Sequence, residues 1–93
     1  MVKGKLSNGF EFEVKDNIKK DYSLIIEYSK YKKDPEDFEQ FDKILTMVLG
    51  EEQRTAFVES FMDGEGCVLS DVLFDGFKEM MGLLSEKDDD LKN

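Results

Sequence analysis

The stretch ILTMVLGEEQ, residues 44–53, constrains the fold of this chain more than any other feature. An apolar run with helical spacing stops at Gly50, and Glu51 and Glu52 follow at once. Glycine readily takes the left-handed conformation that ends helices, and carboxylates favour the positive N-terminal end of a new helix. We therefore expect one helix to end and another to begin at Gly50, with a sharp corner that makes their apolar faces converge.

Helical periodicity predicts four helices, at about 17–31, 35–49, 51–62 and 71–84. Asp16 or Asn17 can cap the first helix. Asp34 can cap the second, with Pro35 in its first helical position. Ser70 can cap the last helix, after a loop of sequence DGEGCVLS.

The helix expected at 17–31 carries two apolar stripes. One stripe contains Ile18, Tyr22, Ile25, Ile26 and Ser29. The other contains Leu24, Tyr28 and Tyr31. Two stripes predict a helix that is buried on more than one side. Lys30, Lys32 and Lys33 suit the negative C-terminal end of its dipole.

Residues 2–14 show the alternation of a β-hairpin. A two-residue turn at Asn8 and Gly9 would mix polar and apolar side chains on one face. A three-residue loop with Gly9 left-handed places all the apolar side chains on one face. The predicted register pairs Leu6 with Phe10, Gly4 with Phe12, and Val2 with Val14. Two strands are barely stable alone, so this face must cover helices or a neighbouring subunit.

The chain of 93 residues, 40% of them hydrophobic, suits one α+β domain at 1–85 that is mainly helical, with the hairpin before about four helices. We expect the polar end, 86–93, to be a flexible tail. The net charge of −9 argues against direct nucleic-acid binding, because phosphates are held by clusters of Lys and Arg. No apolar stretch approaches the roughly 20 residues of a membrane helix, and we expect a cytoplasmic protein that does not bind membranes.

We expect no catalytic residue, metal or cofactor. The chain has no His, so imidazole cannot serve in acid–base chemistry or as a ligand. Cys67 therefore lacks an activating His, and we predict a small buried side chain and not a nucleophile. Asp63 begins a segment similar to a calcium loop, but Val68 and Phe74 stand where such a loop needs Gly and Glu.

The order of these features resembles the small tail assembly chaperones of long-tailed, siphovirus-type phages and prophages of Gram-positive bacteria. The features are the hairpin with NGFEFEV, the helix with DYSLIIE, the joint LGEEQ, the loop DGEGCVLSD and a final amphipathic helix. The resemblance covers nearly the whole chain. It implies a non-enzymatic protein of the host cytoplasm that self-associates and coats the tape-measure protein until the tail tube polymerises. Many members of this family are made in a short and a frameshift-extended form, so the resemblance makes an extended form of this chain a further candidate partner.

A tape-measure chain before assembly is a long amphipathic helix with exposed apolar surface. Many chaperone copies bound side by side would add weak contacts through multivalency. The candidate contact surface is the hairpin face and the last helix, with Phe10, Phe12, Val14, Phe74, Phe77, Met80 and Met81. The same residues can instead form the core. A second hypothesis is an acidic inhibitor that mimics DNA and blocks a restriction or CRISPR nuclease.

Overall fold

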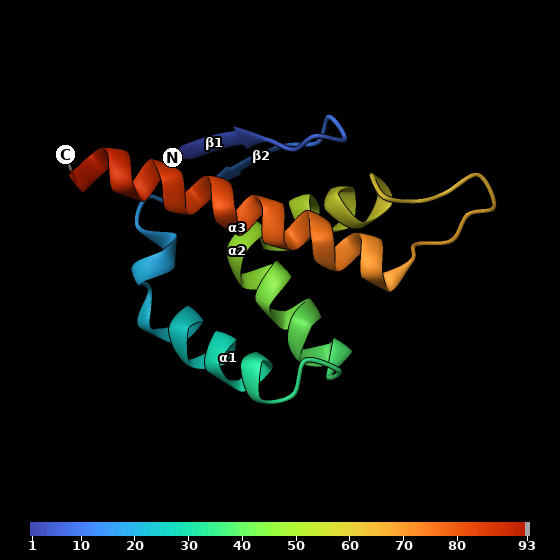
Figure 1. Ribbon diagram of the computed structural model, residues 1–93, viewed down its shortest axis with the longest axis horizontal. Coiled ribbons are helices and arrows are strands. Elements are labelled where there is room, and N and C mark those ends of the chain that lie inside the picture. The colour runs from blue at the N-terminus through green and yellow to red at the C-terminus, as the bar shows by residue number, and fades with distance from the viewer. Residues whose placement is uncertain (93) are drawn as a thin grey trace.

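The computed structural model describes the backbone of residues 1–92 and the side chains of residues 1–86. In this part the chain forms β1 (Val2–Lys5), β2 (Glu11–Val14), a short 3-10 helix η1 (Ile18–Lys20) and the helices α1 (Tyr22–Lys33), α2 (Phe38–Glu59) and α3 (Ser70–Lys92). Helix α3 runs along the long axis of the molecule, with the hairpin above it and α1 below (Figure 1). The predicted architecture, mainly helical with an N-terminal hairpin, is confirmed.

The hairpin has the register that the sequence predicts. Val2 lies opposite Val14, and Gly4 lies opposite Phe12. Gly9 closes the three-residue loop with a φ of 96°. Phe12 and Val14 are buried, so the apolar face of the hairpin covers helices of the same chain.

The predicted break at Gly50 is present, but it lies inside one helical element, α2. Gly50 has φ 79° and ψ 163°, a combination that is essentially restricted to glycine. Because helical backbone continues directly on both sides of this residue, the described part of the chain has three α-helices and not four. The second half of α2 ends at Glu59, three residues before the predicted end.

An ion pair shows how sharply α2 turns at Gly50. Asp42 and Arg54 would lie about 18 Å apart along a straight helix at 1.5 Å per residue. The Nη2 atom of Arg54 instead lies 2.5 Å from Oδ1 of Asp42. The two halves of α2 therefore run in different directions, as Figure 1 shows.

Gln53 connects this corner to the hairpin. Its side-chain amide donates to the carbonyl oxygens of Glu13 and Leu49, each at 2.7 Å. Its side-chain oxygen accepts from the N–H of Glu13 at 2.8 Å. The amide of Gln53 thus pairs with the outer edge of β2 as a neighbouring strand would, and it satisfies a carbonyl beside the break.

Helix α1 begins later than predicted. Its cap is Asp21, whose side chain accepts from the N–H of Leu24 at 3.2 Å. Asn17 has a φ of 63° and precedes η1 without a side-chain cap bond. The prediction of a cap at Asp16 or Asn17 is wrong because the turn of η1 buries Ile18 before α1 starts, and apolar spacing alone does not separate such a turn from a helix.

Helix α2 also begins later, at Phe38, with Asp37 as its cap. The Asp37 side chain accepts from the N–H of Gln40 at 3.1 Å. The predicted cap, Asp34, instead accepts with its carbonyl oxygen from the N–H of Asp37. Pro35 then occupies the second position of a turn, where its fixed φ is equally suitable. The prediction of Asp34 as the cap is therefore wrong, because the turn at Pro35 delays the start of the helix by one turn.

Helix α3 begins at Ser70, but its first hydrogen bond runs from the N–H of Leu73 to the carbonyl of Leu69. Leu69 therefore holds the cap position predicted for Ser70. The helix continues to Lys92, so the backbone of the predicted tail is helical over 86–92. Asn93 and the side chains of 87–93 lie outside the described residues.

The core fills the space between the hairpin, α2 and α3. Phe57 is fully buried at its centre and makes edge-to-face contacts with Phe10 and Phe61, with ring centroids 5.6 and 5.1 Å apart. Glu79 of α3 accepts from both the N–H and the hydroxyl of Ser7, each at 2.8 Å, which holds the hairpin loop against the helix.

Candidate partner-binding site

The contact surface predicted from the sequence is not one exposed surface. Four of the seven residues are at most 3% exposed: Phe12, Val14, Phe77 and Met80. The other three are partly buried and pack against the core: Phe10, Phe74 and Met81. The four buried residues therefore belong to the core, and of the seven, Met81 lines the groove described next.

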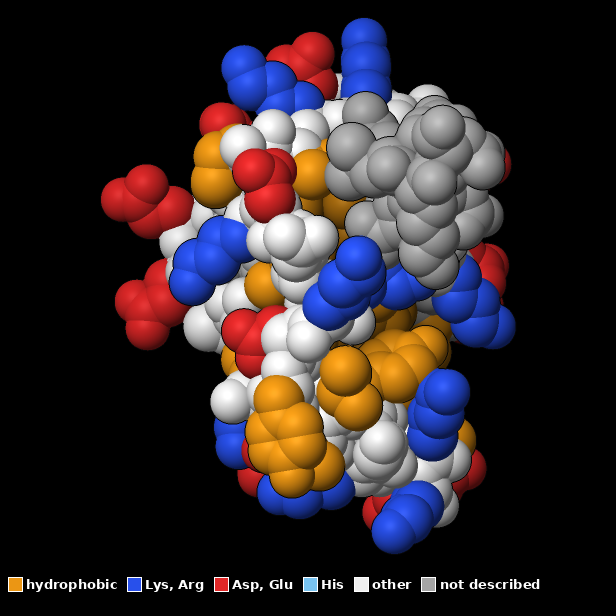
Figure 2. Space-filling view, turned by 90° about the vertical axis from the view of Figure 1, so that its left-hand side faces the viewer, with side chains coloured by type: hydrophobic (Ala, Val, Ile, Leu, Met, Phe, Trp, Pro, Cys, Tyr) orange, Lys and Arg blue, Asp and Glu red, His pale blue; other side chains and the backbone are white. Residues whose placement is uncertain are grey.

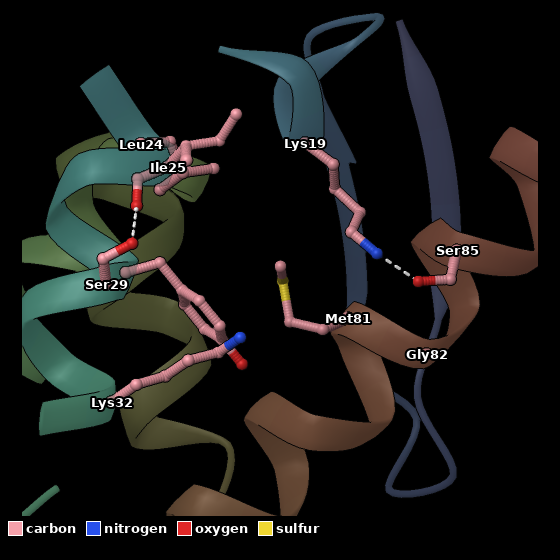
Figure 3. Close-up of a pocket in the computed structure, with 9 residues that line it drawn as sticks. Lys19, Leu24, Ile25, Ser29, Lys32, Met81, Gly82 and Ser85 are labelled. Atoms are coloured by element: carbon pink, nitrogen blue, oxygen red, sulfur yellow. Dashed lines mark hydrogen bonds between the residues drawn. The ribbon is translucent and has the colours of Figure 1, made fainter. Parts of the chain in front are cut away.

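A groove of about 500 Å³ lies between α1 and α3, beside η1 (Figure 3). Its apolar lining comes from Leu24, Ile25, Tyr28 and Met81. Leu24 is buried, whereas Ile25 is 46% exposed at the rim. Met81 projects from α3 into the space between the two helices (Figure 3). The groove is thus an apolar surface that is open to solvent.

One apolar stripe of α1 extends this surface outward. Tyr22 is 76% exposed and Ile26 is 39% exposed, on the same helical face as Ile25. Tyr28 and Tyr31, from the other stripe, pack against the core. The prediction that α1 is buried on more than one side is therefore wrong, because no other described element covers its outer face. Figure 2 shows hydrophobic side chains gathered on this side of the molecule.

Lysines border the groove. Lys19 of η1 donates a hydrogen bond to the hydroxyl of Ser85 on α3. The ammonium of Lys32 lies 5.0 Å from the ring centroid of Tyr28, in cation–π contact. Among the described residues that line the groove there is no carboxylate. Lys and Arg side chains lie beside the hydrophobic ones on this face, together with several acidic side chains (Figure 2).

The charge of this region is opposite to that of the rest of the chain. Residues 18–33 hold five lysines and two acidic residues, a net charge of +3. Residues 34–79 hold three basic and thirteen acidic residues, a net charge of −10. The groove therefore presents a basic border on a protein whose total charge is −9.

Glu27 fixes α1 against α2 behind this face. Its Oε2 accepts from the Gln40 amide at 2.6 Å, and its Oε1 lies 3.1 Å from Nζ of Lys43 and 3.3 Å from Nζ of Lys30. The bonds from Gln40 and then Lys43 lower the pKa of Glu27 to about 2. The carboxylate is thus ionised at neutral pH and its charge is paired, which suits a link between helices and not a proton donor.

The loop between α2 and α3 holds Cys67 exposed, so the prediction of a buried side chain is wrong. The Asp63 carboxylate accepts the N–H groups of Cys67 and Glu65, each at 2.9 Å, and these bonds lower its pKa. The loop therefore folds on its own backbone, away from the core. No group of three His, Cys, Asp or Glu residues within the described part could hold a metal ion.

The sequence contained a signal for the groove that the prediction assigned elsewhere. Two apolar stripes on one helix can mean that one stripe is left for a partner, and Lys32 was attributed to the helix dipole alone. Ile25 lies four residues before Ser29 and Lys32 lies three residues after it, so the three residues share one face of the helix. Ile25 marks the apolar part of the border of the groove, and Lys32 marks the basic part.

Comparisons of the chain with protein-family models, with curated proteins and with solved structures give no match. None of the helices in the described part has both the length and the apolar character that crossing a membrane requires. The features of the molecule that bear on function are therefore the groove, its exposed border and its charge.

Proposed function

We propose that the protein is a non-enzymatic tail assembly chaperone of a siphovirus-type phage or prophage, which acts in the cytoplasm of the bacterial host. It self-associates and coats the tape-measure protein before the tail tube polymerises. The observation that supports this proposal is the open groove between α1 and α3, continued by the exposed side chains of Tyr22 and Ile26.

An amphipathic helix is the ligand class that suits this groove. Helices bind to apolar grooves through side chains spaced three and four residues apart. Met81 provides an unbranched side chain that adapts to different partners. A groove of about 500 Å³ holds a few such side chains, so one copy would bind weakly. Many copies along one tape-measure chain would add these contacts.

The acidic remainder of the chain supports the solubilising part of the proposal. With a charge of −10 over residues 34–79, the surface away from the groove repels other coated complexes. A coat of such copies would replace exposed apolar helix with charged surface. This is the property that a long helical chain needs before assembly.

Co-expression with fragments of a tape-measure protein tests the proposal. We expect the soluble yield of the fragments to rise, and the double variant Tyr22→Ser/Ile25→Ser to lose this effect. Leu69→Ser/Val72→Ser is the matched control, because it also replaces two exposed apolar side chains, and both lie outside the groove. No gain in solubility with any fragment, together with tight binding to a restriction or CRISPR nuclease, would support the acidic inhibitor instead.

Two further parts of the proposal have their own tests. Light scattering over a range of concentrations measures self-association, and a strict monomer at high concentration contradicts it. Mass spectrometry of the products of the intact gene region measures the frameshift-extended form, and a single product of 93 residues contradicts that part.

A further inference from the structure

We infer that the groove between α1 and α3 selects an acidic amphipathic helix, one that carries two carboxylates about three turns apart beside its apolar stripe. The inference deepens the proposed function, and it rests on that function only for the source of the helix. It is carried by the arrangement of lysines around the groove.

The floor of the groove accepts apolar side chains. Leu24 is 4% exposed at its base, and Tyr28 is held in place by the core, with its ring centroid 6.4 Å from that of Phe77. Gly82 of α3 lines the groove, and no described residue lies within 4 Å of the place where its Cβ would be. A ligand can therefore approach the backbone of α3 closely at this point.

The lysines stand at two separate places on the border. Lys19 lies in η1, before the first turn of α1, and Lys32 lies in its last turn. Figure 3 shows these two side chains on opposite sides of Met81. From Tyr22 to Lys32 the helix axis rises about 15 Å at 1.5 Å per residue. Two carboxylates about three turns apart on a bound helix would thus match the spacing of the two lysines along η1 and α1.

The partner must bring the negative charge, because the lining of the groove holds none among the residues whose side chains are described. Its two lysines face no carboxylate among the described lining residues, and Glu27, the carboxylate within α1, is already paired with Lys43 and Lys30. A ligand with carboxylates at its flanks gains two charge-assisted contacts, whereas a basic helix would meet like charges.

A second copy of the chain is a poorer occupant. Its exposed large apolar residues in the acidic region are Phe38, Met62, Leu69 and Val72, and Met62 lies in the loop after α2. Phe38 is the first residue of α2, while Leu69 and Val72 flank the start of α3. These are the ends of two helices and not one continuous stripe, so they do not provide a helix of the length of the groove.

Binding of designed peptides tests the inference. A fluorescent 18-residue helix with a leucine stripe would carry two Glu residues 11 positions apart, and a second peptide would carry Lys at the same two positions. Fluorescence anisotropy at low salt measures the Kd of each peptide with the full chain. We expect the Glu peptide to bind at least 10-fold more tightly, and added salt to reduce this difference.

Charge reversal supplies the decisive comparison. Lys19→Glu/Lys32→Glu should reverse the order of the two peptides. Lys3→Glu/Lys78→Glu makes the same change in net charge outside the groove and should preserve the order. Circular dichroism and Tm confirm that both double variants are folded. Equal binding of the two peptides, or the same reversal in the control variant, would overturn the inference.

The outcomes separate this inference from the proposed function. If tape-measure fragments become soluble without regard to their charge, the inference fails and the chaperone proposal stands. If the acidic peptide binds as expected but no tape-measure fragment becomes soluble, the chaperone proposal fails and the inference stands. If Ile25→Asp abolishes self-association while both peptides bind equally, the groove is an interface between copies and the inference is overturned.

Discussion

The hairpin side of the molecule is closed, and the α1 side is open. On the hairpin side, Gln53 occupies the outer edge of β2, Glu79 holds the loop at Ser7, and Phe57 is fully buried. On the α1 side, Tyr22 and Ile25 remain exposed beside a groove bordered by lysines.

The difference shows that the sequence of an apolar stripe does not determine whether the stripe is buried, because burial depends on the elements that pack against it. The stripes of α2 and α1 have the same helical spacing, but only the first has the hairpin and α3 to cover it. Polar side chains complete the closed side, because every backbone group taken from water there needs a partner. The open side has no such completion, and Lys19 and Lys32 at its border form no ion pair with a described lining residue.

Removal of an aromatic ring from the core should give the largest difference in stability between the closed side and the open side. Phe57→Ala deletes a fully buried ring with two aromatic neighbours, and we expect the free energy of unfolding to fall by about 3–5 kcal/mol. Tyr22→Ala on the open side should change it by no more than about 0.5 kcal/mol. Urea unfolding measures both. Similar losses of unfolding free energy for the two variants would show that Tyr22 is buried in solution, against the contrast between the two sides.

Gly50→Ala tests the corner in α2. The new Cβ meets nothing within 4 Å, so its whole cost comes from the backbone conformation at φ 79°. We expect a loss of about 1–3 kcal/mol in unfolding free energy. The matched control is Gly82→Ala, where the Cβ is also unobstructed but the backbone is helical, and stability should rise by about 0.5–1 kcal/mol. Two changes of the same sign in thermal unfolding would contradict this account of Gly50.

Gln53→Ala removes the side chain that joins this corner to β2. Glu13 is exposed, so water can replace part of the lost bonding, and we expect a loss of about 1 kcal/mol. Gln53→Glu keeps the acceptor for the Glu13 N–H and loses the donor. Its Tm should therefore lie between that of the parent chain and that of Gln53→Ala. Hydrogen exchange at the Glu13 amide should accelerate in the alanine variant. Unchanged exchange there would mean that Gln53 does not protect the strand edge.

The link between α1 and α2 should give the smallest effect, and its signature is a pH dependence of stability in acid. The pKa of Glu27 is about 2 in the folded protein against an ordinary 4.5, so the folded state binds this proton less readily. Its contribution to stability is therefore complete above pH 4.5 and is lost as the pH falls from about 4.5 to about 2. Urea midpoints over this range should fall less steeply for Glu27→Gln than for the parent chain. If the urea midpoints of the two proteins fall in parallel with pH, Glu27 is not a source of the sensitivity to acid.

The sequence predicted correctly those features of the backbone that depend on residues close together in the chain. Period-two alternation together with Gly9 predicted the register of Val2 with Val14, since a shift by one residue would turn every apolar side chain outward. Gly50 followed by two glutamates predicted the break in α2. Helix starts were less certain from the sequence: Asp21 and Asp37 are the caps in place of earlier residues with the same chemistry.

The candidate site was not predictable in the same way. Phe12, Phe77 and Met80 were proposed as contact residues because they are large and apolar, and they are in the core. Their exposure depends on which elements pack together over long separations in the chain. Ile25 lay on a stripe that the sequence did identify, but the pattern could not show that the stripe faces solvent.

The sequence by itself determined the local conformations: the hairpin register, the break at Gly50 and the helical stripes, because each follows from steric and hydrogen-bonding preferences within a few residues. The tertiary structure alone decided which stripe is covered. The physical reason is that burial depends on the area that other elements provide, and here the hairpin and α3 cover α2 while the outer face of α1, with its lysines, remains exposed.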